Sequence, residues 1–129
     1  MRIIKFRGKC TDDGMWRYGD LLHDNGLLWI NDNGLHCTVD ENTVGQFTGL
    51  TDKNGTEIYE GDILLKEGTH MPIAVSFNHG AFGFTNIFKE HYAFAANPNF
   101  TFNPKNADGT FEIIGNVTDT PELKDKFYD

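Results

Sequence analysis

Short apolar runs alternate with turn signals along almost the whole chain. The clearest run is Leu-Leu-Trp-Ile at residues 27–30, which lies between two Asp-Asn-Gly sequences at 24–26 and 32–34. Asn and Gly tolerate positive φ, and Asn-Gly turns connect the strands of tight β-hairpins. The pattern therefore predicts an antiparallel meander from residue 16 to about residue 38.

The same alternation continues in the second part of the chain. Asp-Lys-Asn-Gly at residues 52–55 predicts a hairpin turn, and residues 56–60 place β-branched and aromatic side chains at alternate positions. Further strands are predicted at 63–65, 73–77 and 109–114. The expected fold class is mainly β: an N-terminal β-meander, then a small SH3-like barrel or a strongly bent antiparallel sheet that residues 111–117 close.

Two segments depart from the strand pattern. Residues 86–96 contain neither Pro nor Gly, and both a short helix and a strand fit them, because periodicity does not decide so short a run. Near the end, Thr120, Pro121 and Glu122 combine a capping hydroxyl, a proline suited to the first helical position and an early acid. They predict a short C-terminal helical turn to about Lys126. Residues 97–108 are expected to form a loop.

The length of the chain suits one compact domain, residues 1–129. A hydrophobic content of 39% is enough for a packed interior. The pattern also fits a subdivision into an N-terminal meander at 1–48 and a barrel-like core at 49–129. Because no linker rich in Pro, Gly and Ser separates the two parts, we expect them to share a core.

The charge balance narrows the class of partner. The chain has 11 basic and 19 acidic residues, a formal net charge of −8, and such a protein is poorly suited to neutralise many phosphates. A basic protein surface is thus a more natural partner than nucleic acid. No apolar stretch approaches the roughly 18 residues of a membrane span, and no leader-like segment is seen. We expect a cytoplasmic protein with no membrane partner.

The residue types that carry catalysis and metal binding show no recognised spacing. Cys10 and Cys37 match no zinc pattern, and reduced thiols are expected inside the cell. The chain lacks a P-loop, a dinucleotide fingerprint, a nucleophile elbow and Cys-x-x-Cys, and its turns lack the acidic first ligand of a calcium loop. We expect no enzyme activity, cofactor or metal site. A carboxylate or histidine site assembled only by the fold stays open as an alternative.

The second half of the chain is dense in aromatic side chains. Buried rings stabilise a core, whereas several exposed rings favour association, so the pattern predicts either a phenylalanine-rich core or an interface. The residues concerned are Phe77, Phe82, Phe84, Phe88, Tyr92, Phe94, Phe100, Phe102 and Phe111.

A second use for aromatic rings is stacking against unpaired bases, as on small barrels that bind oligonucleotides. Basic residues usually accompany such rings, and few lie among those of the second half. The first strand offers Lys5, Arg7 and Lys9, which alternation would place on one face. A charged strand edge that resists aggregation explains these cations equally well.

Residues 46–64, QFTGLTDKNGTEIYEGDIL, resemble the signature of the YopX family, small proteins typical of phages and prophages of Gram-positive bacteria. Residues 4–9 with 16–21, and residues 111–117 with 121–123, are similar to the opening and the close of that family. The resemblance implies no established activity and no catalytic residue. Within this signature, Tyr59 and Asp62 are the candidates for a functional interaction surface. The residue types favour the alternative that they shape and end a strand.

Together these observations predict a phage or prophage accessory protein without catalytic activity. We expect it to act by protein interaction or self-assembly, as a homo-oligomer or with a host or phage protein. Two alternatives stay open, a nucleic-acid-binding small-barrel module and an enzyme whose carboxylate or histidine site is invisible in the sequence.

Overall fold

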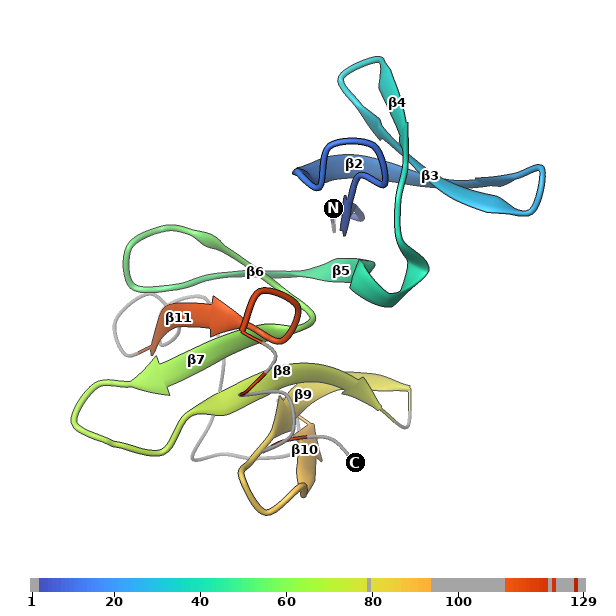
Figure 1. The fold of residues 1–129 in the computed structure, drawn as a ribbon. Helices are drawn as coiled ribbons and strands as arrows, with labels where there is room; N and C mark the ends of the chain where they lie inside the picture. The colour runs from blue at the N-terminus through green and yellow to red at the C-terminus, as the bar shows by residue number, and fades with distance from the viewer. Residues whose placement is uncertain (1–2, 79, 94–110, 121, 123–126, 128–129) are drawn as a thin grey trace. The chain divides into compact units, whose positions relative to one another are not determined.

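The structure is a computed structural model that describes residues 3–78, 80–93, 111–120, 122 and 127 (Figure 1). The described residues form eleven strands and one 3₁₀ turn, η1 (Glu41–Thr43). The strands are β1 (Phe6–Lys9), β2 (Trp16–Asp24), β3 (Leu27–Asp32), β4 (Leu35–Thr38), β5 (Gly45–Thr51), β6 (Glu57–Tyr59), β7 (Asp62–Lys66), β8 (Ile73–Asn78), β9 (Ala81–Thr85), β10 (His91–Ala93) and β11 (Phe111–Asn116). The prediction of a mainly β protein is confirmed.

The strands belong to two antiparallel sheets, with the orders β4-β3-β2-β1-β5-β6 and β10-β9-β8-β7-β11. Within the described residues neither sheet closes into a barrel, so of the two alternatives for the second part the antiparallel sheet holds and the SH3-like barrel does not. The contacts of the chain divide it into two compact units, Met1–Gly49 and Leu50–Asp129. That these units fold as one domain stays a prediction.

In the first unit, β1 to β4 form the predicted meander, and each strand pairs with the next (Figure 1). The turns after β2 and β3 use positive φ at both central residues, 53° and 73° at Asn25-Gly26 and 51° and 93° at Asn33-Gly34, which matches the right-handed twist of the strands. Beyond β4 the chain returns to β1, because the amide of Asp40 donates to the carbonyl of Lys9 at 3.0 Å. The prediction of a meander is therefore confirmed.

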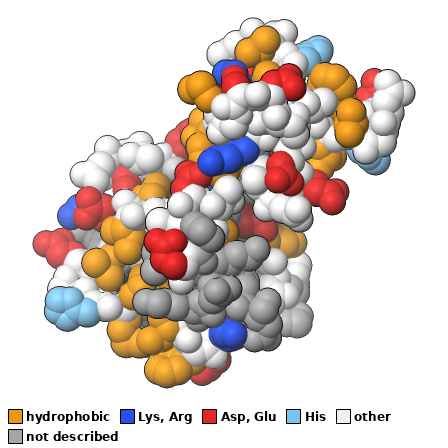
Figure 2. Space-filling model, in the orientation of Figure 1, with side chains coloured by type: hydrophobic (Ala, Val, Ile, Leu, Met, Phe, Trp, Pro, Cys, Tyr) orange, Lys and Arg blue, Asp and Glu red, His pale blue; other side chains and the backbone are white. Residues whose placement is uncertain are grey.

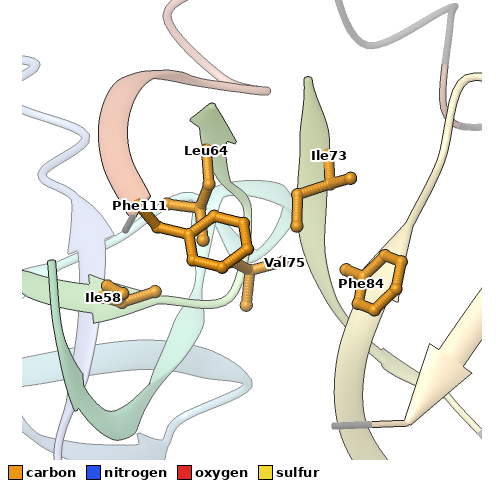
Figure 3. Packing of buried hydrophobic residues seen from close by; sticks show 6 residues of the cluster. All are labelled: Ile58, Leu64, Ile73, Val75, Phe84 and Phe111. Atoms are coloured by element: carbon orange, nitrogen blue, oxygen red, sulfur yellow. The ribbon is translucent and has the colours of Figure 1, made fainter. Parts of the chain in front are cut away.

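The second unit buries apolar side chains on both faces of its sheet. Neighbouring residues of a strand point to opposite faces, and accordingly Leu64 and Ile63 of β7 belong to different clusters. The larger cluster draws on five strands, and Figure 3 shows its side chains pointing toward one another: Ile58, Leu64, Ile73, Val75, Phe84 and Phe111. The smaller cluster contains Ile63, Ala74 and Phe127.

The structure describes only part of the two segments that depart from the strand pattern. Residues 91–93 of the segment 86–96 form strand β10, and residues 94–96 lie outside the described ones. The predicted loop at 97–108 also lies outside them. The predicted C-terminal turn falls mainly on residues 121 and 123–126, which are likewise outside the described part of the chain.

The described aromatic rings are divided between the core and the surface. Phe84 and Phe111 are buried in the larger cluster, whereas Phe77 and Phe88 are exposed. Phe94, Phe100 and Phe102 lie outside the described residues. The aromatic side chains of the second half thus supply part of the core and part of the surface.

Gly19 gives a direct test of the meander. A Cβ atom at this position would lie 2.0 Å from the backbone oxygen of Asn31 on the neighbouring strand, and φ is +157°. We expect Gly19→Ala to lower the free energy of unfolding by about 2–3 kcal/mol, because backbone atoms must shift. Chemical denaturation measures the loss.

Gly14→Ala is the matched control. Gly14 has a φ of +71°, but nothing lies within 4 Å of its Cβ position, so only the backbone strain of about 1 kcal/mol is expected. Equal losses for the two variants would contradict the close approach of β2 and β3 at Gly19.

Candidate functional site

Tyr59 and Asp62, the two candidates from the sequence, lie in the interior of the second unit. Each is only 2% exposed, and the Asp62 carboxylate accepts a hydrogen bond from the Tyr59 amide at 2.7 Å. Between them, Gly61 has a φ of +96° and donates its amide to the carbonyl of Val75 at 2.8 Å. Their position supports the alternative role, in which the two residues shape the turn that ends β6 and begins β7.

Asp52, in the same signature, joins two separate parts of the second unit. Its carboxylate is 2% exposed. One oxygen accepts the amides of Asn54 and Thr56 at 2.9 Å each, and the other accepts the amide of Ile113 at 3.1 Å. An aspartate before an Asn-Gly turn is the sequence signal for the local bonds. No signal in the sequence announces the bond to β11, which lies 61 residues away.

The contact with β11 covers a sheet edge. Strand β11 is the last in its sheet, and an open edge offers unpaired amides and carbonyls to other chains. Here the amide of Ile113 donates to Asp52, and the carbonyl of Phe111 accepts the amide of Lys53 at 2.8 Å. The recognisable signature of this chain is thus a structural device that joins a turn to the end of a sheet.

A cavity of about 470 Å³ opens beside the larger core cluster. Aromatic and aliphatic side chains dominate its described lining, where the rings of Phe84 and Tyr92 stack with centroids 5.4 Å apart. The Glu90 carboxylate accepts a hydrogen bond from the Tyr92 hydroxyl at 2.5 Å. This hydrogen bond raises the pKa of the Tyr92 phenol. Lys66 supplies the charge in the described lining. The arrangement suits an apolar group and brings no carboxylate pair together there.

In the first unit, one face of the meander carries exposed apolar side chains. Leu22 of β2 lies directly opposite Trp29 of β3, and Asp24 lies opposite Leu27. Since alternate residues share a face, Tyr18, Leu22, Leu27 and Trp29 lie on the same side. We call these four residues the meander face. The exposed fractions are 44% for Tyr18, 43% for Leu22 and 50% for Leu27, and Figure 2 shows hydrophobic side chains at the surface of this unit.

The basic residues of β1 lie against aromatic rings. The Arg7 guanidinium is 4.7 Å and the Lys9 ammonium 5.6 Å from the centre of the Trp16 ring, and the Lys5 ammonium is 5.0 Å from that of Phe47. Arg7 and Lys9 therefore share one face of the strand, as alternation predicts. Cation–π contacts stabilise such pairs, and these rings are already in contact with the chain's own cations.

Metal-ligating side chains do not gather in the described part of the chain. Among these residues no group of three or more His, Cys, Asp or Glu side chains has a geometry that could hold a metal ion. The described residues also include no helix with the length and apolar character needed to cross a membrane.

Comparison with known proteins identifies the relatives of the chain. The model of a protein family described as YopX protein matches residues 5–124. A crystal structure of protein EF1440 from Enterococcus faecalis is similar, with 25% sequence identity and a TM-score of 0.60, over 95% of this chain and 99% of that one. A search of curated proteins finds no match.

The contribution of Asp52 to stability can be tested by removing one of its two acceptor oxygens. In Asp52→Asn one carboxylate oxygen becomes an NH₂ group, which cannot accept a backbone amide. We expect the free energy of unfolding to fall by about 1.5–3 kcal/mol, the contribution of a hydrogen bond to a charged group. Chemical denaturation gives the difference. Asp12→Asn, at an exposed carboxylate, is the control, and a loss no larger than the control's would show that the second acceptor oxygen of Asp52 contributes nothing to stability.

Proposed function

The chain belongs to the YopX family, and from this premise we propose that it acts by non-catalytic protein interaction, with the meander face as the surface that associates. The observation that carries the proposal is the exposure of Tyr18, Leu22 and Leu27 on one side of β2 and β3. Contiguous exposed apolar side chains are typical of interaction sites. Association would remove them from water.

A second copy of the chain is the partner that we propose for this face. Sheets pack face to face through side chains that stand out from the strands, and a two-fold dimer brings the same face of each copy together. The aromatic rings of Tyr18 and Trp29 suit such an interface, where one end of the ring is buried and the polar end stays near water. A host or phage protein is the other partner class that the same face would fit.

The family resemblance supports a phage or prophage accessory protein that acts in the cytoplasm of a bacterial host. The net charge of −8 would speed encounter with a basic partner and make that rate fall with salt. The mostly apolar described lining of the cavity beside the larger core cluster supports a role without catalysis.

Self-association is tested with Leu22→Glu. A buried leucine contributes about 1.5–3 kcal/mol and a carboxylate there would have to be desolvated, so we expect the dissociation constant to rise by about tenfold or more. Light scattering coupled to size-exclusion chromatography over a range of concentrations measures it.

Leu35→Glu is the matched control for this variant. Leu35 has a similar exposure, 52%, but pairs with Asp32 on the opposite side of the meander. The Leu35→Glu variant should therefore associate like the wild type. A wild-type protein that is strictly monomeric at high concentration, or two variants that behave alike, would count against self-association through this face.

Nucleic-acid binding is the alternative that the basic first strand favours. Against it stand the net charge and the contacts of Trp16 and Phe47 with Arg7, Lys9 and Lys5, which compete with base stacking. We therefore expect no binding of single-stranded or duplex DNA at about 50 mM salt, where electrostatic binding is strong. Fluorescence anisotropy is the measurement, and saturable binding that weakens with added salt would favour the alternative.

A further inference from the structure

The two cysteines of the chain meet inside the first unit. Cys10 follows β1 and forms an isolated antiparallel bridge with Val39, while Cys37 precedes Val39 by two residues in β4. Residues two apart in a strand share a face, so Cys10 and Cys37 are diagonal neighbours. Both are free thiols, 4% and 8% exposed, and Cys10 is among the neighbours that, after burial, raise the pKa of the Cys37 thiol.

An ion pair lies against the two thiols. Arg17 is opposite Gly8 of β1, which places its side chain on the same side of the sheet as Cys10. One guanidinium nitrogen, Nη2, is 2.6 Å from Oδ2 of Asp13. Arg17 interacts electrostatically with Cys10 and Cys37, and Asp13 interacts with Cys10. The thiols therefore have a charged neighbour of each sign within the unit.

The electrostatics of the site set how fast the thiols react. Burial raises the pKa of the Cys37 thiol and its contact with Cys10 raises it further, whereas Arg17 opposes the shift. The thiolate is the reactive form, so little of the Cys37 thiolate is present at neutral pH and more forms as the pH rises. Burial also excludes large reagents and favours a small oxidant.

We propose that Cys10 and Cys37 are an oxidative modification site, at which hydrogen peroxide converts the two adjacent thiols into an intramolecular disulfide. One thiolate attacks a peroxide oxygen, the O–O bond breaks, and a sulfenic acid forms while the departing hydroxide takes up a proton to give water. The second sulfur then attacks the sulfenic sulfur, the S–S bond forms, and the released hydroxide takes the remaining thiol proton as a second water. The two thiols lose two electrons and two protons, and peroxide is reduced to two waters.

The disulfide would tie the end of β1 to β4 around the two strands between them. It closes a loop from residue 10 to residue 37, and a cross-link of this length stabilises mainly by restricting the unfolded chain. The Cys10–Val39 bridge already holds the ends of this loop together. We expect the thermal midpoint of the first unit's unfolding to rise by about 10 °C on oxidation.

The test treats the reduced full-length protein with hydrogen peroxide, alkylates the remaining thiols in denaturant and measures the intact mass. We expect a monomer lighter by two hydrogen atoms that takes up no alkylating reagent and regains both thiols with dithiothreitol. Peptide mapping should recover Cys10 joined to Cys37. The initial rate should rise from about pH 7 to about pH 9, because the thiolate population grows over this range.

Single variants separate the pair from two independent thiols. Cys10→Ser and Cys37→Ser each leave one thiol, so oxidation should stop at a sulfenic acid that dimedone traps, which the wild type should not accumulate. The peroxide experiment on the wild-type protein remains valid even if one of the two variants does not fold. Two thiols that stay alkylatable after peroxide treatment, oxidation of each thiol alone to sulfinic acid, or a disulfide only between chains would each overturn the proposal.

Discussion

The second unit depends on one buried carboxylate. Asp52 receives three backbone amides, two from its own turn and one from Ile113 in β11. A buried carboxylate without such donors would be costly, and the end of a sheet without a partner would invite pairing with other chains. One side chain meets both requirements. The segment that resembles the family's signature therefore forms the junction between a turn and a sheet.

Local signals predicted the first unit well and the second unit incompletely. The Asn-Gly turns set the meander because their positive φ values are a property of two adjacent residues. The bond from Asp52 to Ile113 depends on where the chain returns after 61 residues, and no pattern reports that. Tyr59 and Asp62 stood out because they lie in the recognisable segment. Only the structure shows that they are buried. Closure into a barrel could not be told from an open sheet, because both have the same alternation.

The two sides of the meander have different chemistry. One side presents Leu22 and Leu27 to solvent on the two strands that the Asn25-Gly26 turn connects, and we assign it to association. The other side buries Cys10 and Cys37 beside Arg17, and we assign it to oxidation. Alternation along β2, β3 and β4 produces this separation. A disulfide on the buried side would stabilise the strands that carry the exposed face without occupying that face.

The central claim is that the meander face is covered when the protein associates. Hydroxyl-radical footprinting at low and high protein concentration tests it directly, with the exposed Tyr92 of the second unit as an internal reference. The account predicts that Tyr18 and Trp29 become protected as concentration rises while Tyr92 keeps its reactivity. Association that protects Tyr92 and leaves Tyr18 and Trp29 unchanged would contradict it.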